Sequence, residues 1–484
     1  MEKREVIALT GASGYIGNNL LQKLTGYSDV IALSRNGDSR ENSDHVEWRS
    51  CDLYSLDSAE KGLEGADYAV YLVHSMMPSA KLTQAKFEDM DLILADNFAR
   101  AAKKNGIKQI IYMSGIIPED TEELSRHLES RLEVEKVLGA YGTPVTTIRA
   151  GLIVGPKGSS FPILTKLVKR LPAMLLPKWT RTKTHPIALK DVLTALKKSI
   201  GNKRLSGKSI DVGGPEVMTY KEMMIQTAEV MGRNTRTFDV PFMTVTLSRL
   251  WVSLITQSPK SIAYPLIESL KHPMVAQKEN MDDEISYGRT PFKEAAKYAL
   301  DEEEKEKKEQ KSSKSSSSKK SGIADVRSVQ RILLPEGKDA DWAGDHYMNW
   351  LSKLARPFLR IEADSSRVSR FYLFGWEKPI MELSYAPDRS SSNRALYYIT
   401  GGSFAEIVEG GRGRIEFRQI PDTQECIIAI HEYRPSLPWI IYRLSQAKIH
   451  IIVMYLYKRH LLNLMDKTDE HKQNGPVKRI VHMN

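Results

Sequence analysis

Two polar residues, His127 and Arg131, stand four positions apart in the stretch LSRHLESRLEVEKVL (residues 124–138). In a helix this spacing places both side chains on one face, one turn apart. An imidazole has a pKa of about 6.5, so it can act as a general acid or base at neutral pH. The neighbouring guanidinium is always charged, presents donors that suit a ribose or an anionic substrate, and favours the neutral imidazole. The alternative is a surface pair without chemistry.

A glycine-rich turn follows the first apolar run of the chain. It reads TGASGYIGNNL (residues 10–20) and is expected to open a helix. Such a turn between a strand and a helix lets backbone N–H groups approach a diphosphate, and the helix dipole favours the negative charge. The glycine spacing and its place in the chain therefore predict a dinucleotide site. The residues expected at the cofactor are Gly11, Ser13, Gly14, Tyr15, Ile16 and Gly17.

The ends of the next two expected strands bear on which cofactor binds. An acid about 20 residues past the glycines would bind a ribose 2′-hydroxyl, whereas an arginine suits a 2′-phosphate. Here VIALSRNGDSR places Arg35 at the strand end, so NADP is favoured and NAD remains possible. A solvated loop charge is the alternative role for Arg35. Asp52, which Leu53 follows, could accept a hydrogen bond from the adenine amine or simply cap the third strand.

Short β-rich runs alternate with helical stretches in the first part of the chain. The expected strands are VIALTG, VIALSR, VEWRSCDL, AVYLVHSM, IIYMSG and VTTIRAGLIVG. Strands that alternate with helices over about 150 residues predict an α/β domain with a Rossmann-like, doubly wound parallel sheet. We place this NAD(P)-binding domain at residues 1–155. Residues 156–300, rich in Leu, Met and Trp, are expected to be a substrate-side extension of the same domain.

A charged and serine-rich stretch, residues 301–321, divides the chain. It has no apolar residue with which to bury surface, which predicts a solvated linker whose acidic start extends the preceding helix. Residues 322–484 show successive strands followed by one amphipathic helix, Trp439 to Leu464, and predict a separate α+β domain similar to the helix-grip arrangement. That helix packs on its sheet, encloses a hydrophobic ligand, or makes shallow membrane contact.

The composition limits the class of protein. With 41% hydrophobic and 27% charged residues, the chain is ordinarily globular. The net charge of +10 is spread along the chain without a basic helix or a known binding motif, so nucleic acid is not an expected partner. The longest apolar runs contain charges, which leaves at most peripheral membrane contact. Cys51 and Cys426 form no disulfide framework or metal-ligand pattern, and the start of the chain does not resemble a signal peptide, which together favour the cytoplasm.

Several motifs resemble those of the extended and atypical short-chain dehydrogenases/reductases. They are TGASGYIG, CDL, YLVHSM, YMSG, IRAGLIVGP, HPIALKDV and IDVGGPEVMTYKEMM, in the order of that superfamily. YLVHSMM, LSRHLESRLEVEKVL and LPAMLLPKW are closer still to the bacterial YbjT-type branch, which is related to NmrA-like proteins. That branch often carries an added C-terminal domain of unknown function. The resemblance implies a Rossmann-fold, NAD(P)-binding oxidoreductase.

The resemblance also implies roles for residues, with one departure. The superfamily's hydride chemistry uses a Ser or Thr at the fifth strand and a Tyr-x-x-x-Lys pair on the following helix. Ser114 matches the first position, but His127 and Arg131 occupy the places of the Tyr and the Lys. His127 would then carry the proton, and Arg131 would orient the ribose or the substrate. His74, at the end of the fourth strand, is an alternative proton carrier.

Three functions remain open at this point. The leading hypothesis is an NADP-dependent oxidoreductase acting on a small, largely apolar carbonyl compound. The missing Tyr and Lys motivate a redox sensor or scaffold that binds the dinucleotide without turnover, as NmrA-like relatives do. The third hypothesis makes the C-terminal domain a carrier of a hydrophobic ligand. The sequence leaves the substrate and the oligomeric state open.

Overall fold

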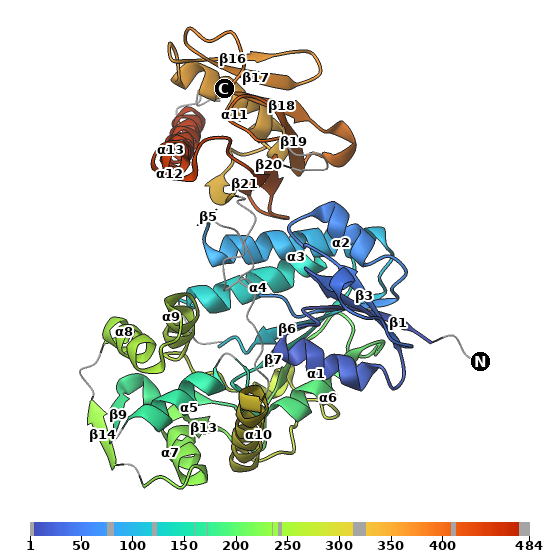
Figure 1. Cartoon of the computed structure of the whole chain (residues 1–484), viewed down its shortest axis with the longest axis vertical. Helices are drawn as coiled ribbons and strands as arrows, with labels where there is room; N and C mark the ends of the chain where they lie inside the picture. Colours follow the sequence, from blue (N-terminus) through green and yellow to red (C-terminus); the bar gives the residue numbers. More distant parts are fainter. Residues whose placement is uncertain are drawn as a thin grey trace, which may run out of the picture. The chain divides into compact units, whose positions relative to one another are not determined.

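The computed structural model describes residues 4–74, 82–118, 123–158, 160–171, 173–234, 236–240, 244–312, 326–407 and 413–473. The chain divides into two compact units (Figure 1). The N-terminal unit comprises residues 1–77 and 91–319, and the C-terminal unit comprises residues 78–90 and 320–484. The short segment 78–90, expected in the Rossmann domain, thus belongs to the C-terminal unit.

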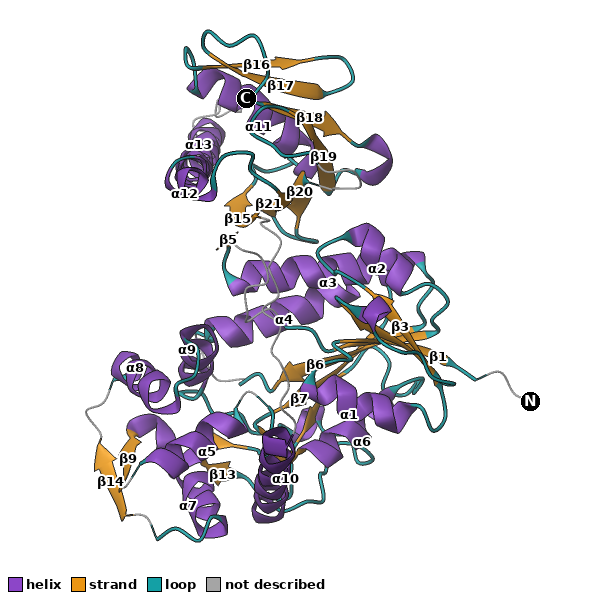
Figure 2. Cartoon of the chain, viewed as in Figure 1, coloured by secondary structure: helices purple, strands orange, loops and turns teal. Residues whose placement is uncertain are grey.

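A seven-stranded parallel sheet forms the centre of the N-terminal unit (Figure 2). In order across the sheet, its strands are β12 (Ser209–Val212), β7 (Val145–Ala150), β6 (Gln109–Gly115), β4 (Tyr68–Tyr71), β1 (Val6–Thr10), β2 (Asp29–Ser34) and β3 (Val46–Ser50). All neighbours pair in parallel. The strand order changes direction between β1 and β4, which opens a crevice at the carboxyl ends of these strands. The predicted doubly wound, Rossmann-like sheet is confirmed.

Helices cover both faces of this sheet. They are α1 (Tyr15–Leu24), α2 (Leu56–Gly62), α3 (Phe87–Lys104), α4 (Arg126–Gly139) and α6 (Leu189–Ser199). Figure 1 shows α2, α3 and α4 on one face and α1 and α6 on the other. Because both faces are covered, the central strands β1, β4 and β6 are largely apolar, as expected for a parallel sheet. Leu9, Leu20, Val70, Ile111 and Leu196 are fully buried between the sheet and its helices.

A second apolar core lies beyond the carboxyl ends of β6 and β7. Its elements are β8 (Ile153–Val154), α5 (Phe161–Arg170), β9 (Ala173–Pro177), β10 (Lys183–Thr184), β11 (Ile187–Ala188), β13 (Met218–Thr219), α7 (Tyr220–Val230), β14 (Arg236–Val240), α8 (Val245–Thr256), α9 (Lys260–Ser269) and α10 (Phe292–Ser312). Three short 3-10 helices complete the unit: η1 (Gly37–Ser39), η2 (Lys178–Arg181) and η3 (Lys278–Asn280). Phe161, Leu167, Met223, Val252 and Phe292 are buried in this core.

The acidic start of the expected linker extends the preceding helix, as expected. Residues 301–312 continue α10 as helix, and residues 313–321 lie outside the described part of the chain. Ion pairs hold this acidic stretch on the unit. Lys169 Nζ lies 2.7 Å from Glu303, and Lys157 Nζ lies 2.7 Å from Glu306. A segment without apolar residues can therefore be ordered by charge pairing along a helix.

An eight-stranded sheet forms the C-terminal unit. In order across the sheet, its strands are β16 (Leu359–Ala363), β17 (Val368–Leu373), β18 (Met381–Tyr385), β19 (Arg394–Gly401), β20 (Arg414–Gln419), β21 (Glu425–Tyr433), β15 (Val326–Leu333) and β5 (Leu82–Gln84). Neighbours pair antiparallel except at the edge, where β5 runs parallel to β15. The predicted α+β class is confirmed.

Helices α11 (Ala340–Leu354), α12 (Trp439–Leu444) and α13 (Gln446–Gln473) complete the C-terminal unit, with a 3-10 helix, η4 (Pro387–Arg389). The single helix expected from Trp439 to Leu464 is broken at Ser445, where the backbone leaves the helical conformation. Tyr347 lies edge-on to Tyr457, with ring centroids 5.0 Å apart, and 5.6 Å from Phe417. Aromatic side chains thus occupy the centre of the core between helices and sheet. Across the described residues, no helix is long and apolar enough to span a bilayer.

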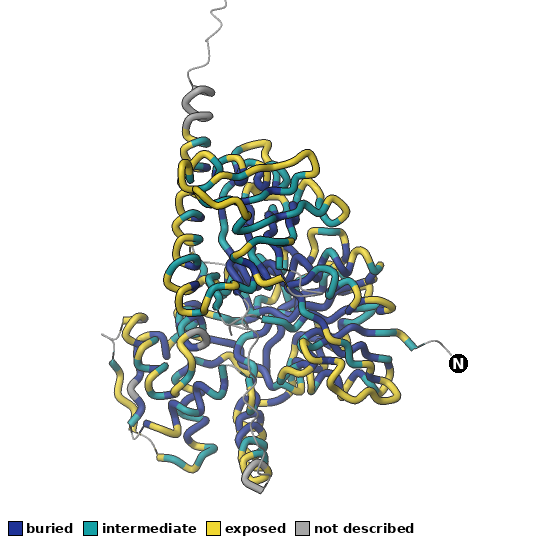
Figure 3. The backbone as a smooth tube through the Cα atoms, turned by 45° about the horizontal axis from the view of Figure 1, so that its top comes forward, coloured by how far each residue is buried: buried dark blue, intermediate teal, exposed yellow. Residues whose placement is uncertain are grey.

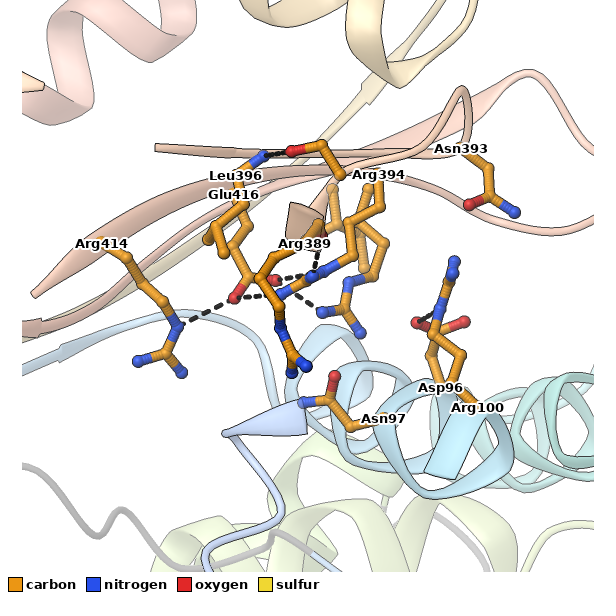
Figure 4. A network of polar contacts seen from close by, with 12 residues as sticks. Asp96, Asn97, Arg100, Arg389, Asn393, Arg394, Leu396, Arg414 and Glu416 are labelled. Carbon is orange, nitrogen blue, oxygen red and sulfur yellow. Dashed lines mark hydrogen bonds and ion pairs between the residues drawn. The ribbon is translucent and has the colours of Figure 1, made fainter. Parts of the chain in front are cut away.

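The opposite face of that sheet carries a buried cluster of charges (Figure 4). Arg414 Nε lies 2.8 Å and Arg394 Nη2 lies 3.2 Å from Glu416 Oε1, and Arg418 Nη2 lies 2.5 Å from Oε2. Burial acts to raise the pKa of Glu416, but the three guanidinium groups outweigh it and hold this pKa well below its usual range. The carboxylate stays ionised, and Arg414 also pairs with a second acid, since its Nη1 lies 2.7 Å from Glu432 Oε1.

Candidate active site

The glycine turn leaves the start of α1 open to a ligand. Gly11 has a positive φ of 64°, and its carbonyl accepts a hydrogen bond of 2.8 Å from Gly14 N–H. A Cβ added to Gly17 would lie 2.1 Å from that carbonyl oxygen, so only glycine lets the helix begin so close to the strand. Gly14 is the N-cap of α1 and offers no side-chain cap to the first N–H groups of the helix. Free N–H groups at a helix start suit a phosphate.

The other residues of the turn fix its position. Tyr15 is half-buried and packs against Gly155, where an added Cβ would lie 2.4 Å from the phenol oxygen. Burial raises the pKa of Tyr15, and Tyr298, Glu306 and Glu302 raise it further. Helix α10 therefore runs beside the start of α1, although the sequence predicted part of it to be linker.

Ser13 and Ile16 lie on opposite sides of the turn. Ser13 is exposed, next to the open start of the helix, whereas Ile16 packs against the core beneath the sheet. The predicted contact of both residues with the cofactor stays a prediction.

Arg35, Asp52 and Leu53 lie at the carboxyl ends of β2 and β3. Arg35 is exposed just after β2. Asp52 Oδ1 accepts a hydrogen bond of 3.1 Å from Tyr54 N–H, so this carboxylate caps the turn after β3. Leu53 is buried, and its carbonyl accepts a hydrogen bond of 2.7 Å from Asn97 Nδ2. Of the two roles that the sequence left open for Asp52, the structure shows the cap after the third strand.

A buried polar cluster lies where β4 and β6 end beneath α3 and α4. His74 Nδ1 donates to Asp91 Oδ2 at 2.5 Å, because an ionised carboxylate only accepts. The rings of His74 and His127 lie 5.2 Å apart. Arg131 Nη1 donates to the phenol oxygen of Tyr112 at 3.3 Å, and that phenol lies 3.4 Å from the Arg131 carbonyl. His127 and Arg131 thus lie on one side of α4, as the spacing predicted.

Ser114 lies at the same edge of the sheet. Its residue is 6% exposed, and its Oγ forms no hydrogen bond of ordinary geometry with the described residues. The structure therefore brings together Ser114, His74, His127 and Arg131 at the ends of adjacent strands and the helix above them. Whether these residues perform chemistry stays a prediction.

Burial and charge keep both histidines neutral. Burial lowers the pKa of His127 well below its usual value, and the charges of Arg131 and His74 lower it further. Burial and Arg131 also lower the pKa of His74, against the opposing effect of Asp91. For Arg131, burial acts to lower the pKa, but Tyr112 and Asp91 outweigh it and the pKa is raised. At neutral pH the cluster holds two neutral imidazoles beside one cation.

His127 also lines an apolar cavity of about 110 Å³. The cavity lies at the carboxyl ends of β6 and β7 and is closed by α5, α7 and α9, with Leu164, Leu167 and Leu270 among its walls. Two of its lining residues, His127 and Trp179, have a buried ring nitrogen that forms no hydrogen bond with any described residue. An indole nitrogen can only donate, and an imidazole nitrogen can donate, so both suit an oxygen of a bound molecule.

Asp91 and Tyr112 were not identified from the sequence as members of this cluster. Asp91 is 2% exposed and shares the core-facing stripe of α3 with Leu94, Ala95 and Phe98. An acid at a core position of an amphipathic helix is a signal that the sequence did contain, because an ionised side chain is seldom buried without a partner. No such signal marks Tyr112, since a tyrosine in a buried strand is ordinary.

Groups of His, Cys, Asp and Glu that could hold a metal ion are absent from the part of the chain that the structure describes. Both cysteines are buried, and burial raises the pKa of each thiol to about 12. Neither thiol is therefore a ready nucleophile.

Comparison with known proteins agrees with the geometry of the glycine turn. Residues 11–166 match the family model described as NAD(P)H-binding. The auxiliary protein GraX of Staphylococcus aureus is 34% identical over 142 residues, which are 29% of this chain and 42% of GraX. The chain thus spans less than half the length of that relative. A UDP-glucose 4-epimerase of Vibrio cholerae is 22% identical over 262 residues, 49% of this chain and 78% of the epimerase.

Solved structures of similar proteins include the NADPH-dependent quinone oxidoreductase QOR2 of Escherichia coli with NADPH. It has a TM-score of 0.49 and 17% identity, and the match covers 61% of this chain and 99% of that one. The triphenylmethane reductase of Citrobacter sp. with NADP(H) has a TM-score of 0.48 and 18% identity, over 61% of this chain and 100% of the other. The family match confirms the prediction of an NAD(P)-binding domain in this part of the chain.

Proposed function

We propose that the protein is an NAD(P)H-dependent oxidoreductase that acts on a small, largely apolar carbonyl compound. The observation that carries the proposal is the position of His127, which lines an apolar cavity at the carboxyl ends of β6 and β7. The glycine turn lies at the same edge of the sheet, where ligands of doubly wound folds bind. A dinucleotide that starts at the glycine turn and follows this edge would bring its nicotinamide towards the cavity.

The residues present fit such a cofactor. The positive φ of Gly11 and the close backbone approach at Gly17 both require glycine, and the turn keeps the N–H groups of α1 open for a diphosphate. Arg35, exposed after β2, would bind a 2′-phosphate and so favour NADP. When bound, the nicotinamide supplies or accepts the hydride.

His127 and Ser114 would act on the reacting oxygen. An N–H of the neutral His127 imidazole donates a hydrogen bond to the substrate oxygen, and this bond strengthens as negative charge develops. The imidazole can also pass a proton by exchanging tautomers, since one ring nitrogen gives its proton as the other takes one up. The Ser114 hydroxyl, one residue before the cavity residue Gly115, would be the second donor. The ring of His74 lies 5.2 Å away, but its one N–H is donated to Asp91, so His127 would regain its proton from solvent.

Arg131 has a different role in this proposal from the one predicted. Its guanidinium bonds to Tyr112 Oη rather than lining the cavity. We therefore assign Arg131 to positioning and electrostatics: its charge keeps His127 neutral and stabilises negative charge on the substrate oxygen.

A turnover experiment tests the proposal. The full chain is mixed with NADPH and a panel of aldehydes, ketones and quinones, and the loss of NADPH absorbance is followed. His127→Ala should lower kcat on the order of 10²- to 10⁴-fold, as expected for loss of a group that transfers a proton. NADPH affinity should not change. Glu129→Ala, an exposed position on the same helix, is the matched control and should retain turnover.

Two results would contradict the proposal. Undiminished turnover in His127→Ala would remove the catalytic assignment. Tight NADPH binding without oxidation by any compound of the panel would favour the sensor or scaffold instead. The carrier hypothesis stays a prediction, which native mass spectrometry for a retained lipid would test.

The preference for NADP has its own test. Arg35→Ser should weaken NADPH binding by roughly 10- to 100-fold, because a hydrogen bond to a charged group contributes about 1.5–3 kcal/mol. NADH binding should be unchanged. An equal loss for both coenzymes, or no loss for either, would argue against a 2′-phosphate contact.

A further inference from the structure

Helices α12 and α13 expose large apolar side chains over their outer face. Figure 3 shows α13, the long helix that ends in grey, exposed along one side. The inner side packs on the core through Ala447, Met454, Tyr457 and Leu461, all nearly fully buried. The residues more than half exposed on the outer face are Ile440, Ile441, Leu444, Ile449, Ile452 and Tyr455. A helix that only covers a sheet would present polar residues to solvent here.

An apolar surface of this kind marks a binding site. Single exposed apolar residues are common, but a contiguous group on one helical face is not. Ile449, Ile452 and Tyr455 follow one another at steps of three residues, so they form a short stripe near the start of α13. The three exposed residues of α12 precede that stripe in the chain.

The charges around the stripe define the partner. No Asp or Glu occurs between Tyr433 and Met465, whereas Arg443, Lys448, Lys458 and Arg459 are all exposed. The surface therefore combines exposed isoleucines with cations alone. A helix of this composition lies in the interface of a bilayer, where the apolar side chains enter the acyl boundary and the cations meet anionic headgroups.

A second copy of the chain fits this surface less well. In a two-fold dimer the same patch meets itself, so the cations of one copy would approach those of the other without any acid between them. A bilayer also fits the absence of a spanning helix among the described residues, since contact of this kind is peripheral.

We propose that the outer face of α12 and α13 docks on the surface of an anionic lipid bilayer. The exposed isoleucines insert below the headgroups, and Lys448 and Arg459 hold the phosphates. Helix α12 and the first turns of α13 lie against the membrane surface, because the exposed apolar residues gather between Ile440 and Tyr455.

Vesicle binding by the full chain tests this proposal. Flotation is compared for vesicles of phosphatidylcholine alone and vesicles with an equal amount of phosphatidylglycerol. The protein should float with the anionic vesicles, and added salt should weaken binding because it screens the cations. The Ile449→Asp/Ile452→Asp variant should lose at least about tenfold in binding, since each change places a carboxylate in the apolar boundary. Lys448→Ala and Arg459→Ala should each lose about fivefold.

A matched control distinguishes binding through this surface from non-specific binding through any exposed apolar residue. Leu254→Asp changes an apolar residue that is 76% exposed on α8 and should leave vesicle binding unchanged. Thermal melting of each variant checks that it is folded. The proposal is overturned if the wild-type chain does not bind anionic vesicles, or if the Ile449→Asp/Ile452→Asp variant binds them as well as wild type. It is also overturned if the wild-type chain self-associates without binding lipid and the Ile449→Asp/Ile452→Asp variant no longer self-associates.

Discussion

The two units depart from ordinary folding rules in opposite ways. The N-terminal unit buries polar groups: Asp91 is 2% exposed and pairs with His74, and the neighbouring His127 lines the cavity. The C-terminal unit exposes apolar groups: Ile449 and Ile452 face solvent on α13. Both arrangements are costly for folding alone, since buried polar groups need partners and exposed isoleucines gain nothing from burial.

The difference shows which kind of partner each unit can have. A buried polar cluster beside a small cavity acts on a molecule that enters the protein, so its chemistry depends on exact positions and on pKa values. An exposed apolar stripe with cations acts on a surface that the protein approaches, so it depends on area and charge. A polar residue that is buried therefore points to a small-molecule site in one unit, and an apolar residue that is exposed points to a docking face in the other.

Removing a buried polar group should have the largest effect on stability. Asp91→Ala takes the carboxylate from His74 and from the charge of Arg131, and we expect the free energy of unfolding to fall by about 3 kcal/mol. Asp44→Ala, at an exposed position, should change it by less than about 0.5 kcal/mol. Urea denaturation of both variants measures the difference. Equal stability of the two variants would show that the cluster is not a structural unit.

Acid should weaken the N-terminal unit through the same cluster. The folded pKa values of His74 and His127 lie below the ordinary value, so near pH 6 the unfolded chain binds more protons than the folded chain. Stability is therefore greatest above about pH 6.5 and falls as the pH is lowered from there towards the folded pKa values.

A histidine variant isolates this effect. His127→Gln should reduce the dependence of unfolding free energy on pH by up to about 1.4 kcal/mol per pH unit below pH 6.5. Urea titrations at a series of pH values measure the slope, and His45→Gln, at an exposed position, is the control. An unchanged slope in His127→Gln would mean that His127 is protonated in the folded protein.

Changing the exposed stripe should have the smallest effect on folding. Ile452→Ser alters a side chain that is 57% exposed, and we expect a change in unfolding free energy within about 0.5 kcal/mol. The same urea experiment measures it. A loss near that of Asp91→Ala would show that Ile452 is packed against protein, and the contrast between the two units would disappear.

Local patterns predicted much of the fold. The run RALYYITGG corresponds to β19 (Arg394–Gly401), and TGASGYIG marks the turn between β1 and α1. These elements are encoded within a few residues, either by the pattern of apolar and polar residues or by the spacing of glycines. The pair His127 and Arg131 was likewise predictable, because it lies within one helical turn of α4.

Pairings between distant segments were not predictable. Strand β5 (Leu82–Gln84) has only three residues and pairs with Val326–Ser328, more than two hundred positions away. Nothing in its short sequence specifies that partner. Residues 82–90 belong to the C-terminal unit, whereas His74 and Asp91 belong to the N-terminal unit. The contact between His74 and Asp91 joins residues 17 positions apart on separate elements, so the candidate site could be predicted only in part.

Coenzyme binding at the glycine turn tests the central claim most directly. NADPH is titrated into the wild-type chain, Gly17→Val and Gly26→Ala, and coenzyme fluorescence is followed. A Cβ at Gly17 meets backbone 2.1 Å away, whereas at Gly26 it meets nothing within 4 Å. We predict that Gly17→Val weakens binding on the order of 100-fold, about 2.7 kcal/mol, while Gly26→Ala binds like wild type. Equal NADPH affinity in all three proteins would contradict the account, because the diphosphate would then not lie at this turn.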